Sequence, residues 1–77
     1  MNSIPAPPRQ LGLVLSHIRS GGLALVPTYL TCTVIDAKCL AKWDQAGIPL
    51  LREDGDGYRL ARGRKSVYLL PGQLKLA

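Results

Sequence analysis

The stretch AGIPLLREDGDGYRL, from Ala46 to Leu60, decides how we expect this chain to fold. Gly47 suits the left-handed conformation that ends a helix, and Pro49 lacks the N–H that a continuing helix needs. The segment Asp54–Gly57, which reads Asp-Gly-Asp-Gly, is a strong signal for a tight turn because these residues tolerate positive φ. The stretch therefore predicts the end of a helix, a strand, a glycine turn and a returning strand.

Helical periodicity predicts one helix early in the chain and another just before this stretch. In residues 9–20 the apolar side chains recur at the spacing of a single helical face, and Gly21-Gly22 ends the pattern. In residues 34–46, Leu40 and Trp43 belong to a second apolar stripe, and Trp43 is expected to anchor the core.

The residues between the two helices are harder to assign. Leu23–Val26 is predicted either as a strand or as the start of a further helix, and Pro27–Leu30 as a very short helix that begins at proline. A turn follows, in which Thr31 or Thr33 caps the next helix. After the hairpin, residues 66–70 have the composition of a strand and residues 73–77 could form a last one. Residues 1–8 are expected to be a flexible leader, and residues 9–77 a single domain.

Charge points to an anionic partner. The 77 residues carry ten Lys and Arg against five Asp and Glu, a net charge of +5, which favours nucleic acid over a membrane surface. Four cations fall between Arg59 and Lys65, and three acids precede them between Glu53 and Asp56. The tip of the predicted hairpin is therefore anionic although its returning strand is cationic.

Residues that could carry catalysis or bind a metal are scarce. Cys32 and Cys39 match no zinc-binding spacing, and His17, expected on a solvated helix face, lies far from both in sequence. We therefore predict no enzyme activity, no metal and no cofactor. The start of the chain lacks the pattern of a signal peptide, and polar residues with a Gly-Gly break exclude a membrane span in residues 11–30. A cytoplasmic setting is the expectation.

A helix that runs through Gly47-Ile48-Pro49 into Gly57-Tyr58-Arg59-Leu60 resembles the third helix and wing of winged helix-turn-helix DNA-binding domains of the biotin-repressor type. The resemblance spans about residues 9–62. It implies an α+β winged-helix fold, with two to three helices followed by a β-hairpin wing. It also implies a small transcriptional regulator of phage or bacterial style that binds double-stranded DNA without a cofactor, as a homodimer on a two-fold site.

By this resemblance, helix 34–46 reads the DNA groove and the basic hairpin strand 59–65 contacts phosphate. The residues expected to contact DNA are the polar and cationic side chains of these segments and their flanks, namely Thr31, Thr33, Lys38, Lys42, Gln45, Arg52, Arg59, Arg62, Arg64 and Lys65. The alternative for Lys38 and Lys42 is an ordinary solvated helix face, and the arginines could instead guard a strand edge against aggregation.

A second hypothesis is a protein-interaction module, such as a phage-type inhibitor or adaptor that binds a host protein. The short segment before helix 34–46 and the acidic hairpin tip favour it. Hydrophobic residues make up 47% of the chain, which is too small to bury all of them. The side chains of Tyr29, Tyr68 and Leu69-Leu70 could therefore form an exposed patch that binds a partner or a second copy. RNA binding is a weaker third option because aromatic platforms are few.

Overall fold

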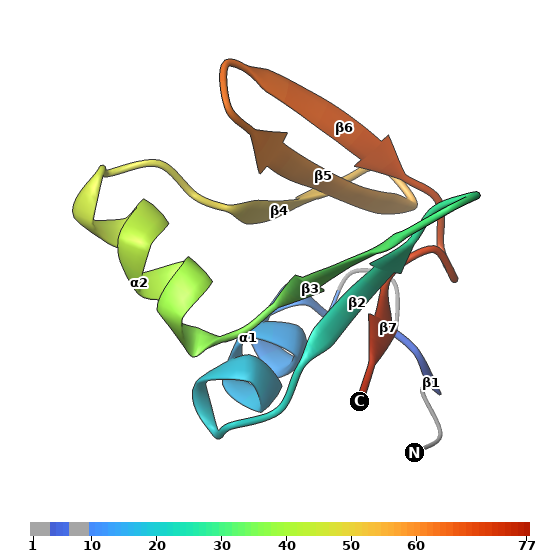
Figure 1. The fold of residues 1–77 in the computed structure, drawn as a ribbon, viewed down its shortest axis with the longest axis horizontal. Helices are drawn as coiled ribbons and strands as arrows, with labels where there is room; N and C mark the ends of the chain where they lie inside the picture. Colours follow the sequence, from blue (N-terminus) through green and yellow to red (C-terminus); the bar gives the residue numbers. More distant parts are fainter. Residues whose placement is uncertain (1–3, 7–9) are drawn as a thin grey trace.

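The computed structural model describes residues 4–6 and 10–77, and these residues form two helices and seven strands in two antiparallel sheets (Figure 1). The chain is therefore mixed α+β, as the sequence predicts. In chain order the elements are β1 (Ile4–Pro5), α1 (Leu11–Arg19), β2 (Ala24–Pro27), β3 (Cys32–Ile35), α2 (Ala37–Gln45), β4 (Leu51–Asp54), β5 (Gly57–Arg62), β6 (Lys65–Leu69) and β7 (Lys75–Leu76).

The first sheet, sheet A, joins the two ends of the described chain. Its strand order is β1-β7-β2-β3, so β7 near the end of the chain lies between β1 and β2. Lys75 pairs with Pro5 on one side and with Leu25 on the other. Ile4 and Pro5, which fall within the predicted leader, thus belong to this sheet, and the next residue, Ala6, is buried in the core. Residues 1–3 and 7–9 lie outside the described part.

The second sheet, sheet B, is a meander of β4, β5 and β6. Its first turn lies at Gly55-Asp56 and its second at Gly63-Arg64. Gly55 and Gly63 have φ angles of 57° and 62°, in the left-handed region that glycine adopts most easily. This conformation explains why each turn contains a glycine at that position. The predicted strand, turn and returning strand are confirmed, and the strand expected at 66–70 is β6.

The segment from Pro27 to Ile35 differs from the prediction. The short helix expected at Pro27–Leu30 is wrong, because this segment ends β2 and turns back into β3. The Thr28 N–H donates to the Thr31 carbonyl at 2.7 Å, and the two threonine hydroxyls lie 2.8 Å apart. These contacts close a hairpin around Tyr29-Leu30. The two helices are therefore separated by a β-hairpin.

The helix predicted over 34–46 begins later than expected, at Ala37. Asp36 is its N-cap, and its carboxylate accepts the Cys39 N–H at 3.0 Å. This bond lowers the pKa of Asp36. The expected Thr31 or Thr33 cap is wrong because both threonines belong to the preceding hairpin. A β-branched run through Ile35 favours a paired strand there over a helix start.

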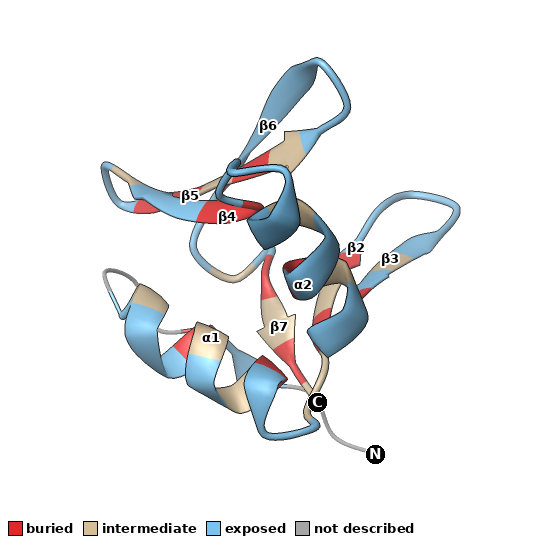
Figure 2. Cartoon of the chain, turned by 90° about the vertical axis from the view of Figure 1, so that its left-hand side faces the viewer, coloured by how far each residue is buried: buried red, intermediate tan, exposed pale blue. Residues whose placement is uncertain are grey.

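The core lies between the helices and the two sheets (Figure 2). Val14 and Ile18 of α1 are fully buried, and so are Tyr58 of β5 and Leu74. Trp43, expected to anchor the core, is half-buried and packs against its edge. Burial of these side chains supplies the main force that holds the two sheets together.

Helix α1 depends on sheet B for its cap. The Glu53 carboxylate accepts the Leu11 N–H at 2.9 Å, whereas Gln10 makes no side-chain cap bond. Beside it, burial and then the charge of Glu53 raise the pKa of Tyr58. A residue 42 positions away thus satisfies a free N–H at the start of α1.

Candidate nucleic-acid interface

One face of sheet B carries a row of cationic and aromatic side chains. Arg52 of β4 pairs with Arg59 of β5, which pairs with Tyr68 of β6. Paired residues lie on the same face of an antiparallel sheet, and neighbours along a strand point to opposite faces. Because Tyr58 and Leu60 are buried, Arg59 and its row lie on the opposite, outer face. We call this surface the outer face of sheet B.

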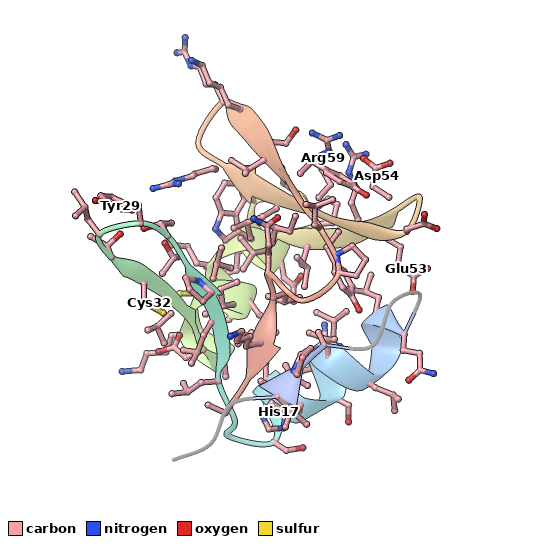
Figure 3. All side chains as sticks on the ribbon, turned by 90° about the vertical axis from the view of Figure 1, so that its right-hand side faces the viewer. His17, Tyr29, Cys32, Glu53, Asp54 and Arg59 are labelled. Atoms are coloured by element: carbon pink, nitrogen blue, oxygen red, sulfur yellow. The ribbon has the colours of Figure 1, made fainter. Side chains whose placement is uncertain are left out.

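Arg59 is held in a defined orientation on the outer face. Its Nε and Nη2 both lie close to Asp54 Oδ2, at 2.9 and 2.8 Å (Figure 3). Its guanidinium carbon is 5.3 Å from the centre of the Tyr68 ring, within cation–π range. Gly57 leaves room for this arrangement, because a Cβ built there would come within 2.9 Å of the Tyr68 hydroxyl.

A depression of about 270 Å³ lies beside this row and extends to the turn between β5 and β6. We call it the basic depression, because four cationic side chains and no acidic one line it. Its residues are Ile48, Pro49, Arg52, Arg59, Ala61, Gly63, Arg64, Lys65 and Ser66. Within residues 4–6 and 10–77, Arg52, Arg64 and Lys65 form no ion pair. Their charges are therefore available to an anionic ligand.

No acidic residue lines this depression, although Asp54 pairs with one of its lining residues, Arg59. The acids expected at the hairpin tip belong to β4 and to the turn before β5, whereas the cationic turn follows β5. Six residues of strand separate the two turns, about 20 Å at the usual rise of a strand. Glu53 caps α1, and Asp54 binds Arg59. The anionic tip and the cationic turn are therefore opposite ends of sheet B.

The remaining predicted contact residues lie elsewhere. Lys38, Lys42 and Gln45 are exposed on α2, at the spacing of one helical face. Thr31 is bound to Thr28 in the β2–β3 hairpin. Thr33 and Arg62 line a second, more apolar depression of about 200 Å³, together with Trp43 and residues of β3, α2 and β5. The structure thus gathers four of the ten predicted residues in one depression and leaves six at other places.

Tyr68 and Ser66 were not predicted as members of this site. Tyr68 was expected only in an apolar patch with Tyr29 and Leu69-Leu70. Tyr29 lies in the turn between β2 and β3 of the other sheet and Leu69 is buried, whereas Leu70 is exposed. The signal for Tyr68 was alternation along residues 65–69, which places it opposite Arg59 once β6 is known to pair with β5. The sequence alone does not show that β6 pairs with β5.

The remaining reactive groups are dispersed. His17, expected to be solvated, is half-buried: its ring packs over Gly22, and its Nε2 lies 2.9 Å from the main-chain oxygen of Ala77. Cys32 is exposed and Cys39 half-buried, and both are free thiols. In the part of the chain that the structure describes, no three His, Cys, Asp or Glu residues lie together as a metal site would require. In the same part, no helix is long and apolar enough to cross a membrane.

Comparison of the chain with protein-family models, with curated proteins and with solved structures gives no match.

Proposed function

We propose that this chain binds double-stranded DNA through the basic depression and the outer face of sheet B. The observation that carries the proposal is the gathering of Arg52, Arg59, Arg64 and Lys65 around one depression that no acidic residue lines. Cations arranged in this way neutralise phosphate and release counterions, which is the main source of affinity for DNA.

In this proposal α2 is the groove-reading helix, as in the winged-helix resemblance. The β5–β6 hairpin acts as the wing, in place of the β4–β5 hairpin to which the resemblance applies. The wing turn carries Arg64 next to Gly63, a small residue that lets a phosphate approach the main chain. Helix α2 presents Lys38, Lys42 and Gln45 to solvent. Phosphate contacts from the wing position the chain, and side chains of α2 read base edges. The proposed role is a transcriptional regulator that needs no cofactor.

The first test is fluorescence anisotropy with labelled duplex DNA over a salt series. The double variant Arg64→Gln/Lys65→Gln removes two cations of the depression. Because each phosphate contact contributes about 0.9 to the slope of log K against log salt, we expect the slope to fall by about 1.8. The matched control is Arg19→Gln/Lys75→Gln, which removes the same charge from α1 and β7 and should change the slope far less.

Two single variants separate the two proposed surfaces, α2 and the basic depression. We expect Lys42→Ala to reduce the preference for one duplex over a scrambled one, whereas Arg64→Ala weakens binding to both alike.

If both double variants change the slope equally, net charge alone explains binding and the depression is not the site. Absence of binding at physiological salt would reject the DNA proposal and favour the protein-interaction hypothesis.

A further inference from the structure

The β2–β3 hairpin is the largest charge-free part of this basic chain. Residues 20–35 include no Asp, Glu, Lys or Arg, although the whole chain has a net charge of +5. The same segment displays large apolar side chains, with Tyr29 96%, Leu30 84% and Val34 48% exposed. In Figure 3 Tyr29 stands at the tip of the hairpin, away from the body of the molecule. Exposed apolar side chains without charge mark a contact surface.

The outer edge of β3 also lacks the protection that the other sheet edges have. The edges of the two described sheets are β1, β3, β4 and β6. β1 contains a proline, β4 carries three charged residues and β6 begins with Lys65. β3 reads Cys-Thr-Val-Ile, with neither charge nor proline. A free edge of this kind is a template for pairing with another strand, and charge or proline normally prevents that pairing.

The main chain of β3 is oriented for such pairing. The Thr28 N–H donates to the Thr31 carbonyl, so these two residues form a hydrogen-bonded pair next to the turn. Hydrogen-bonded and non-hydrogen-bonded pairs alternate along an antiparallel ladder. Thr33 and Ile35 therefore direct their main-chain groups toward β2, and Cys32 and Val34 direct theirs toward the open edge.

We propose that β3 pairs with β3 of a second copy of this chain, antiparallel across a two-fold axis. The charge distribution favours a second copy as the occupant. Two chains of +5 repel one another least through a face that has no charge, whereas a foreign partner of a basic protein is ordinarily recruited by its acidic residues. An antiparallel pair of identical strands is self-complementary, as a two-fold interface requires. The basic depression has no lining residue from β3, so the proposed dimer contact and the proposed DNA contact use different residues.

The test is the oligomeric state of the full chain by sedimentation velocity over a concentration series. We expect a monomer–dimer equilibrium in the parent. Val34→Lys places like charges across the axis and should raise the dimer dissociation constant at least about tenfold. The matched control is Val67→Lys on β6, a valine of similar exposure on another sheet edge, which should leave the dissociation constant unchanged. Circular dichroism of each variant checks that it folds.

A mixing experiment protects the test against a variant that merely misfolds. Val34→Glu alone should also weaken the dimer, and an equimolar mixture of Val34→Glu and Val34→Lys should restore it, because the opposed charges now attract across the axis. A parent that is monomeric at every concentration overturns the proposal, and so does a dimer that Val67→Lys weakens as much as Val34→Lys. Because the readout contains no DNA, it stands apart from the test of the DNA proposal.

Discussion

The same small change, glycine to alanine, should have three different effects on the stability of this protein. At Gly57 an added Cβ would overlap the main-chain carbonyl of Leu69 and approach the Tyr68 hydroxyl to 2.9 Å. The carbonyl belongs to the neighbouring strand and cannot turn aside as a flexible side chain would. Forcing atoms into so close a contact costs up to about 3 kcal/mol, so we expect Gly57→Ala to destabilise the fold by about that amount.

The comparison positions are Gly55 and Gly12, where an added Cβ meets nothing within 4 Å. Gly55 has a φ of 57°, in the left-handed region, so Gly55→Ala should cost about 1–2 kcal/mol through the backbone alone. Gly12 lies in α1 and has no such strain, so Gly12→Ala should stabilise the protein by about 0.5 kcal/mol.

The assay is urea unfolding of the three variants beside the parent. A domain of this length is stable by roughly 4–12 kcal/mol, so a loss of about 3 kcal/mol is readily measured and Gly57→Ala remains partly folded. The corresponding shift in Tm is about 4–8 °C for each kcal/mol. If Gly57→Ala costs no more than Gly55→Ala, then β6 does not lie against Gly57 as described. The Arg59–Tyr68 contact on the outer face would then also be in doubt.

Three further predictions concern the N-cap of α2, the buried tyrosine and the core. Asp36→Ala should lower Tm because the Cys39 N–H loses its acceptor, and Asp36→Asn should recover most of the loss. Because the folded-state pKa of Asp36 is lowered, the contribution of its carboxylate to stability is present above the unfolded pKa and is lost as the pH falls through the folded-state pKa. Thermal melts of Asp36→Asn should therefore lack this loss of Tm at acid pH. Because the folded-state pKa of Tyr58 is raised, its contribution to the stability of the fold is full below the unfolded pKa of about 10 and is lost at higher pH. Tyr58→Phe should therefore reduce the fall in Tm at alkaline pH. A fall in Tm equal to that of the parent would contradict this reasoning. Leu74→Ala, at a fully buried position, should cost about 2–5 kcal/mol in urea unfolding, and a loss below 1 kcal/mol would mean that its site is not closed.

Local sequence signals predicted the parts of the fold that depend on neighbouring residues. The apolar stripe of α1, the end of α2 at Gly47 and the turn at Gly55 follow from helical periodicity and from glycine. The segment Pro27–Ile35 was misread because a proline start and threonine caps are compatible with a helix. Pairing of β3 with β2 decides otherwise, since it satisfies the main chain of both segments.

The candidate site was predicted in part for the same reason. The cationic residues Arg59, Arg64 and Lys65 were visible as a cluster in the chain, because they lie within seven positions of one another. Whether the acidic residues share their surface depends on which turn each group occupies. That question is settled by the pairing of β6 with β5, which makes a second hairpin, because the sequence predicts a strand at residues 66–70 but not its partner.

The sequence by itself determined the presence of both helices and strands, the turn at Gly55 and the net positive charge, because each depends on residue types and their spacing. Only the tertiary structure decided that β7 lies between β1 and β2, that Glu53 caps α1 and that Tyr68 lies across Arg59. Each of these joins residues distant along the chain. Such contacts form because they satisfy free main-chain groups and bury apolar surface, and no local pattern records which distant partner does so.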